Sequence, residues 1–228
     1  MKLISILFIA TSHSLMGGTG EPTGLWAEEL ADPYYQFQEQ KYEIEVASID
    51  GGEIPLDPRS INDDAPESTK RFLDDAKAMA KLNNSVALKD VDLSKYDAIF
   101  LPGGHGTVWD FPKNAKLAEI VGKAMDENKV VASVCHGPVG LLSTKLANGD
   151  SILKGKNVTG FSNTEEEAVE LTNVVPLLLE DEMVKLGANY TKADNFKPYA
   201  VKDGNLITGQ NPASSAKVAE LVIETLNK

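Results

Sequence analysis

Residues 130–142 of this chain read VVASVCHGPVGLL, in which a short apolar run leads directly into a cysteine and two closely spaced glycines. A buried strand that ends at Cys135, followed by a tight turn that Gly137 and Gly140 permit, has the form of a nucleophile elbow. Such an elbow exposes its side chain at the carboxyl end of a strand, where open α/β sheets bind ligands. The N-terminus of the following helix would favour the thiolate, which is the reactive form of cysteine.

Apolar runs typical of strands alternate along the rest of the chain with segments of helical period. Strands are expected at residues 3–10, 42–49, 98–101, 130–134, 157–159 and 206–208, and helices at residues 66–82, 116–128, 175–186 and 214–226. Residues 50–62, rich in Gly, Pro and Asp, are interpreted as a loop or a small subdomain. This alternation predicts one α/β domain over residues 1–228, with a mostly parallel sheet covered by helices on both faces.

The composition is that of an ordinary globular protein, since 42% of the 228 residues are hydrophobic and 25% are charged. The formal net charge of -12 argues against nucleic acid and anionic membrane surfaces as partners. We expect the apolar run at residues 3–10 to be a first strand rather than a signal peptide, and it is too short for a membrane span. The single cysteine forms no disulfide within the chain, which suits a reducing compartment and predicts a cytoplasmic protein.

A second glycine-rich turn, residues 102–107 with the sequence PGGHGT, follows the expected strand at 98–101. Its glycines let the backbone approach a ligand and aim N–H groups at an anionic oxygen, so we predict an oxyanion and substrate site at Gly104, His105 and Gly106. The backbone N–H of His136 would complete the oxyanion hole. A phosphate-binding turn is the weaker interpretation, because the lysine and hydroxyl residue of a P-loop do not follow.

The chain has three histidines, His13, His105 and His136, and none follows His136. Papain-like proteases and class I glutaminase domains place the partner histidine downstream of the cysteine, so neither arrangement can be built here. His105 and His136 therefore remain as candidate imidazoles. One cysteine and three scattered histidines do not have the spacing of a zinc site, and we expect no metal.

These motifs resemble those of the ThiJ/PfpI superfamily, which has a flavodoxin-like three-layer sandwich related to class I glutamine amidotransferases. Within it, the chain is similar to the heat-shock chaperone branch whose members act as glutathione-independent glyoxalases (glyoxalase III). The resemblance covers nearly the whole chain and depends on residues 103–107 (GGHGT), 134–138 (VCHGP), 160–161 (GF) and 209–214 (GQNPAS). It implies that Cys135 is the nucleophile and His136 its neighbouring histidine. It also matches Glu29, or Glu28 if the register slips by one, to the acidic residue that hydrogen-bonds the cysteine sulfur.

The third triad member in this branch is an acidic residue six positions after the glycine of residues 160–161, which falls on Glu166. The family usually has glycine where Glu165 stands, and Glu167 adds a third carboxylate. From the residues alone, this acidic run is interpreted equally well as the capped start of a helix. Which of the three carboxylates orients His136 therefore stays open at this point.

The resemblance implies a lyase of the D-lactate dehydratase type that converts a 2-oxoaldehyde, typically methylglyoxal, to a 2-hydroxy acid (lactate) without a cofactor. It also implies a homodimer. In the mechanism we hypothesise, the Cys135 thiolate attacks the aldehyde carbon and the N–H groups of Gly104 and His136 hold the oxyanion. Either His136 or Glu29 moves a proton through an enediol, while Glu166 orients His136. Burial beside the thiol should keep Glu29 protonated.

Three other functions fit the same residues. The first is a holdase chaperone with unfolded-protein clients, or a protein deglycase, on the same fold. The second is an intracellular cysteine peptidase or amidase. The third is a redox-sensing module without turnover, in which Cys135 is oxidised but catalyses nothing.

Overall fold

A seven-stranded sheet forms the centre of the computed structural model, which describes residues 3–228. Its strand order is β3-β2-β1-β4-β5-β9-β8, and neighbouring strands are parallel except β8, which pairs antiparallel with β9. With the short edge strand β3 set aside, the order β2-β1-β4-β5-β9 is that of flavodoxin-like sheets. The strands are β1 (Ser5–Ala10), β2 (Glu43–Ser48), β3 (Val86–Ala87), β4 (Ala98–Leu101), β5 (Val130–Val134), β8 (Ala200–Asp203) and β9 (Leu206–Gly209).

Helices cover both faces of the sheet because the central strands are apolar on both sides. Along β1, Ile6 and Phe8 pack into one core and Leu7 and Ile9 into the other, as the alternation of a strand requires. The first core includes side chains of α1 (Glu28–Glu39), α2 (Glu67–Asp74), α3 (Ala76–Asn83) and α8 (Ser215–Leu226). The second includes side chains of α4 (Thr107–Asp110), α5 (Ala115–Asp126) and α7 (Leu179–Lys185). The predicted three-layer α/β sandwich is therefore confirmed.

Some elements differ from the sequence-based prediction. The helix expected at 66–82 is two helices, because the backbone is extended at Asp75, whose carboxylate caps the N–H groups of Lys77 and Ala78 at the start of α3. The strand expected at 157–159 is β6 (Asn157–Val158), which pairs with β7 (Asn189–Tyr190) in a separate small sheet. The sequence reasoning did not predict β3, β7 and β8. All three are short, and their side chains are at most half-buried.

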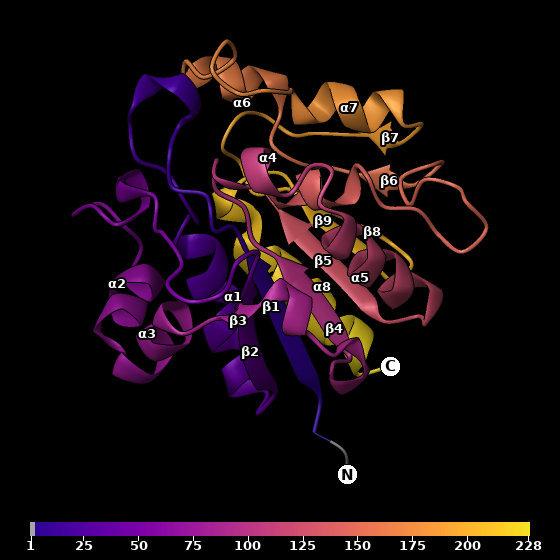
Figure 1. Ribbon diagram of the computed structural model, residues 1–228, viewed down its shortest axis with the longest axis horizontal. Coiled ribbons are helices and arrows are strands. Elements are labelled where there is room, and N and C mark those ends of the chain that lie inside the picture. The colour runs from indigo at the N-terminus through magenta and orange to yellow at the C-terminus, as the bar shows by residue number, and fades with distance from the viewer. Residues whose placement is uncertain (1–2) are drawn as a thin grey trace.

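The carboxyl ends of β1, β4 and β5 meet at one end of the sheet, and α6 (Asn163–Ala168) and α7 lie across that end in Figure 1. Six short 3₁₀ helices complete the part of the chain that is described: η1 (Gly17–Thr19), η2 (Pro58–Ser60), η3 (Leu88–Asp90), η4 (Leu93–Lys95), η5 (Gly137–Leu141) and η6 (Pro212–Ser214). Among residues 3–228, no helix is both long enough and apolar enough to cross a bilayer.

Candidate active site

Cys135 lies at the sharp turn between β5 and η5, where its backbone adopts a positive φ of 60°. This left-handed conformation costs a non-glycine residue about 1–2 kcal/mol, and the neighbouring backbone holds it in place. The Cys135 N–H donates to the carbonyl oxygen of Gly209 at 3.0 Å, and its own carbonyl oxygen accepts from the Phe161 N–H at 2.9 Å. The close approach requires glycine at position 137, since a Cβ there would lie 2.0 Å from the carbonyl oxygen of Leu101. The predicted elbow is present.

His136 connects the thiol to a buried carboxylate. Its Nδ1 lies 3.5 Å from the Cys135 sulfur and its Nε2 lies 2.7 Å from Oε2 of Glu166. Burial alone would raise the pKa of Glu166, but the hydrogen bonds and charges of His136 and His105 lower it well below its usual range. A carboxylate can only accept, so Nε2 of His136 carries the proton and Nδ1 is left to take the proton of the thiol.

The three neighbouring glutamates of α6 have separate positions. Glu166 contacts both imidazoles. Glu165 is fully buried and accepts from the backbone N–H of Ser162 at 3.0 Å, from the N–H of Phe196 at 2.8 Å and from the amide of Asn211 at 2.8 Å. Glu167 is exposed. The geometry therefore places Glu166 against His136 and gives Glu165 a role in holding the surrounding loops.

Glu29 approaches the thiol from the first turn of α1. Its Oε2 accepts the Gly103 N–H at 2.6 Å, and within residues 3–228 its Oε1 has no hydrogen-bond partner of ordinary geometry. Burial raises the pKa of Glu29 well above its usual range, although the Gly103 N–H and the Cys135 thiol act in the opposite direction. Burial therefore favours the protonated form of the Glu29 carboxyl group. Glu28, the alternative from the sequence, is half-buried.

The thiol itself is almost inaccessible, with 4% of the residue exposed. Burial raises the pKa of Cys135 well above its usual range, the Glu29 carboxyl raises it further, and the His136 backbone N–H lowers it. The expected stabilisation of the thiolate by a helix N-terminus is thus outweighed, since η5 is a single short 3₁₀ helix. The resting group is a neutral thiol with a base beside it.

A cavity of about 310 Å³ opens onto the sulfur. Gly104 lines it with a φ of 98°, and a Cβ there would lie 2.2 Å from the carbonyl oxygen of Gly24. Within the described chain the Gly104 N–H has no protein acceptor, as an oxyanion donor requires. The other lining residues are Trp26, Arg59, His105, Cys135, Phe161, Val169, Phe196 and Pro212.

Gly106 packs against the N-terminal segment and is not among the residues that line the cavity. Its expected role in binding the substrate oxygen stays a prediction. A Cβ at this position would lie 2.6 Å from the carbonyl oxygen of His13 and 2.8 Å from a side-chain carbon of Thr11. Glycine is therefore required here because two backbones pass close together.

Arg59 is the site residue that sequence reasoning missed. Its Nη2 lies 3.2 Å from Nδ1 of His105, whose Nε2 lies 2.7 Å from Oε1 of Glu166. A buried carboxylate, Asp57, holds the guanidinium through two hydrogen bonds of 2.9 and 2.6 Å. The available signal was its rarity, because the chain has two arginines and one of them lies in the loop expected at 50–62.

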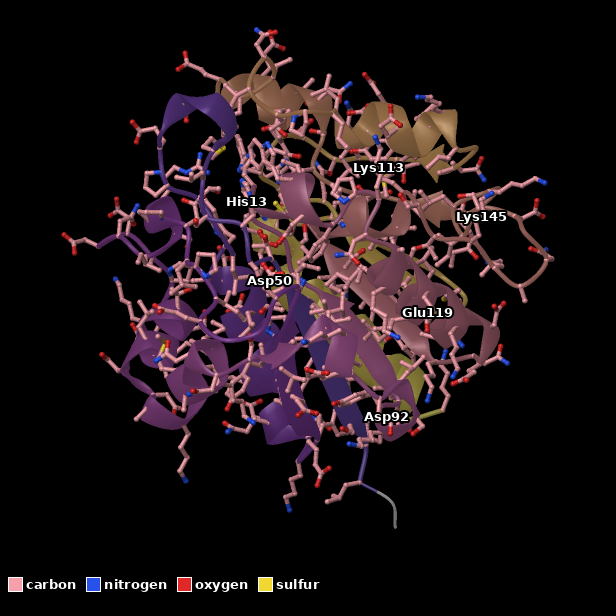
Figure 2. All side chains as sticks on the ribbon, viewed as in Figure 1. His13, Asp50, Asp92, Lys113, Glu119 and Lys145 are labelled. Atoms are coloured by element: carbon pink, nitrogen blue, oxygen red, sulfur yellow. The ribbon has the colours of Figure 1, made fainter. Side chains whose placement is uncertain are left out.

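The third histidine lies outside this cluster. The ring of His13, labelled in Figure 2, stacks on Trp109 at 5.2 Å, and its Nε2 lies 2.7 Å from the carbonyl oxygen of Leu15. Donor atoms of His105, His136 and Glu166 lie within 4.8 Å of one another and could hold a metal ion. In the structure these atoms are hydrogen-bonded to each other, and the absence of a metal cofactor stays a prediction.

A family model described as the DJ-1/PfpI family matches residues 24–225. The chain belongs to this family. Glyoxalase 3 of Candida albicans is 30% identical, over 97% of this chain and 98% of its own. The glutathione-independent glyoxalase HSP31 of Saccharomyces cerevisiae is 28% identical over 97% of each chain.

Solved structures show the same relationship. The Rapid Encystment Protein 24 KDa of Francisella tularensis has a TM-score of 0.95 and 42% identity, over 98% of this chain and 99% of that one. The glyoxalase III of Candida albicans has a TM-score of 0.90 and 30% identity over 97% of each chain. The family and the fold implied by the sequence motifs are therefore confirmed.

Relief of the elbow strain can be measured. We expect the free energy of unfolding of Cys135→Gly to be about 1 kcal/mol higher than that of Cys135→Ala, because glycine adopts the positive φ without steric cost. Urea unfolding of both variants measures the difference. Ser133→Gly and Ser133→Ala, within the regular strand β5, are the control. At this position the glycine variant should be the less stable of the two. Equal stability of the two Cys135 variants would contradict a strained elbow.

The buried proton of Glu29 should make stability depend on pH. Because its folded pKa is raised, the unfolded chain loses this proton above about pH 4.3 while the folded chain keeps it, so stability falls as pH rises. Glu29→Gln has no such proton to lose. As the pH rises from 5 to 7, its free energy of unfolding should therefore increase relative to that of the wild type, by up to about 1.4 kcal/mol per pH unit. Urea unfolding at several pH values tests this, with the exposed Glu39→Gln of the same helix as control. Parallel curves for Glu29→Gln and wild type would show that Glu29 is ionised when folded.

Proposed function

We propose that this protein is a glutathione-independent glyoxalase that converts 2-oxoaldehydes such as methylglyoxal to 2-hydroxy acids. The observation that carries the proposal is the pair of groups in contact with one thiol: His136, positioned to accept a proton, and Glu29, buried with a proton to give. Isomerisation of a 2-oxoaldehyde needs both an acid and a base at the same carbon. The names of the relatives at about 30% identity point to the same reaction.

The first step forms the covalent bond. Nδ1 of His136 takes the thiol proton as the Cys135 sulfur attacks the aldehyde carbon. The carbonyl oxygen becomes an oxyanion that accepts from the N–H groups of Gly104 and His136. Glu29 then gives its proton to this oxygen, which yields a neutral hemithioacetal. No charge is left on the substrate in a cavity with apolar walls.

The second step moves a hydrogen between neighbouring carbons. Glu29 is now a buried carboxylate of raised pKa and hence a strong base, so it removes the proton from C1. The electrons form an enediolate with C2, and the oxygen on C2 takes a proton from the His136 imidazolium. Glu29 returns its proton to C2 and then takes up the proton of the C1 hydroxyl as the C1=O bond forms. The hemithioacetal thereby becomes the thioester of a 2-hydroxy acid. C1 is oxidised and C2 is reduced, so no external redox cofactor is needed.

The third step releases the product. The His136 imidazolium protonates an oxygen of the enediolate as the second step proceeds, and the imidazole then activates a water molecule that attacks the thioester. The C–S bond breaks, the sulfur takes a proton and a 2-hydroxy acid leaves. The sum is one 2-oxoaldehyde and one water converted to one 2-hydroxy acid. Glu166 holds His136 throughout, as the third member of a triad does.

The shape of the site favours a small substrate over a peptide. The thiol is 4% exposed and is reached through a cavity of about 310 Å³. Its walls include the aromatic rings of Trp26, Phe161 and Phe196, which suit the alkyl or aryl substituent of a 2-oxoaldehyde. Homodimerisation, unfolded-protein clients and a cytoplasmic location remain predictions from the sequence.

Lactate formation from methylglyoxal without glutathione tests the proposal. We expect turnover by the wild type, none by Cys135→Ala, and a kcat about 10²–10⁴-fold lower for Glu29→Gln and for Glu166→Gln, because each removes a proton-transfer or orienting group. Glu167→Gln, a charge change on the exposed neighbour, is the matched control and should keep wild-type kcat. A wild-type protein with its thiol confirmed as reduced that forms no lactate would overturn the glyoxalase assignment.

A further inference from the structure

The polar network of the site does not end at Glu166. Beyond that carboxylate, His105 and Arg59 extend it to Asp57, at the far side of the cavity. Asp57 is fully buried and also accepts from the hydroxyl of Thr23 at 2.8 Å. A guanidinium fixed by a buried bidentate carboxylate has one orientation, which makes its third contact, to His105, specific.

The directions of these hydrogen bonds follow from chemistry alone. Arginine carries donors and no acceptor, so Nδ1 of His105 must be the acceptor of the Arg59 Nη2–H. A neutral imidazole with an accepting Nδ1 has its proton on Nε2, and that proton points at Oε1 of Glu166. Arg59 thus selects one tautomer of His105, and Glu166 accepts from two imidazoles at once.

We propose that Arg59 is a positioning residue of this active site: by holding His105 as the neutral Nε2–H tautomer, it keeps Glu166 negatively charged and available to stabilise His136 as the latter takes the thiol proton. For turnover this inference rests on the proposed glyoxalase function. The protonation of the imidazoles and the reactivity of the thiol can be followed without that function.

The alternative state that Arg59 prevents is a protonated His105. An imidazolium at this position would neutralise Glu166 and repel the imidazolium that forms on His136, whose ring centroid lies 4.2 Å away. The Nδ1–H of this imidazolium would also face the guanidinium of Arg59, which has no acceptor. The thiolate and imidazolium of Cys135 and His136 would then form less readily.

The charges around His105 support this view. The groups that face it are Arg59, Glu166 and His136, while Asp57 lies behind the guanidinium. Burial is the largest influence and lowers the pKa of His105 to about 4, with His136 and Arg59 acting in the same direction and Glu166 against them. Without Arg59, Nδ1 of His105 no longer has to accept a hydrogen bond. One of the positive charges that oppose protonation of His105 beside Glu166 is also removed. We then expect the pKa of His105 to rise above about 4, while the burial that remains keeps it below the ordinary value of about 6.5.

The test compares wild type, Arg59→Met and Arg59→Lys. It measures the protonation of the His105 ring nitrogens and the reactivity of the Cys135 thiol. In ¹⁵N-detected NMR, wild-type His105 should be a neutral Nε2–H imidazole from pH 5 to 8, and in Arg59→Met it should begin to take up a proton as the pH falls toward 5. The rate of Cys135 alkylation by iodoacetamide, relative to wild type, should then be unchanged above pH 8 and at least about twofold lower at pH 5. Arg59→Lys retains a charged donor and should lie between the two. If Arg59→Met does not fold, Arg59→Lys alone tests the positioning role.

Two controls separate positioning from general damage. Arg71→Met changes the other arginine, whose guanidinium lies over the ring of Tyr35 and outside the site, and it should behave as wild type at every pH. In the double variant Arg59→Met/His105→Asn the loss at low pH should disappear, because no imidazole remains there to titrate. A loss of alkylation rate that is equal at all pH values, or a His105 that stays neutral in both Arg59 variants, would overturn the proposal.

Failure of the proposed function gives a different result. A protein that forms no lactate yet shows the pH-dependent loss in Arg59→Met keeps the positioning role and loses only the glyoxalase assignment. A protein that forms lactate with pH profiles of kcat that are identical in wild type and Arg59→Met keeps the activity and refutes the positioning role.

Discussion

The site depends on one carboxylate, that of Glu166, which accepts hydrogen bonds of 2.7 Å from two buried imidazoles. A buried charge is tolerated only where such donors replace water, and here they come from the turn after β4 and from the turn after β5. The carboxylate comes from α6, which a capping box of Ser162 and Glu165 starts at the required place. Three elements distant in sequence therefore converge on one group, and the orientation of His136 against Cys135 follows from it.

The two acidic residues next to this chemistry have pKa values shifted in opposite directions. Glu29 lies against a single N–H in an apolar setting, which raises its pKa, whereas Glu166 has two imidazole donors that lower its own. Titratable groups whose pKa values are driven apart in this way are suited to act as acid and base in the same site. The fold supplies the difference, because Glu29 lies in the first turn of α1 against Gly103 while Glu166 faces His105 and His136.

Sequence reasoning recovered the parts of the molecule that are encoded locally. Apolar runs located β1, β4 and β5, and the glycines after Cys135 identified the elbow, because tight turns leave a signal in neighbouring residues. It could not rank Glu166 over Glu165, since both face inward from the first turn of α6 and only distant partners such as Asn211 distinguish them. Arg59 carried no local signal, because its role arises from Asp57 and from a histidine 46 positions away. The break at Asp75 was missed because the apolar period continues across it.

The protonation state of the thiol bears on what kind of protein this is. A redox sensor needs a standing thiolate, which a low pKa and exposure to solvent provide. Here burial is the largest influence and raises the pKa of Cys135. A neutral thiol of this kind becomes a nucleophile when a base takes its proton during attack, and His136 is already oriented to do so. A site that generates its thiolate only together with a bound electrophile protects the cysteine between turnovers. That property suits an enzyme whose thiol is to react with its bound substrate.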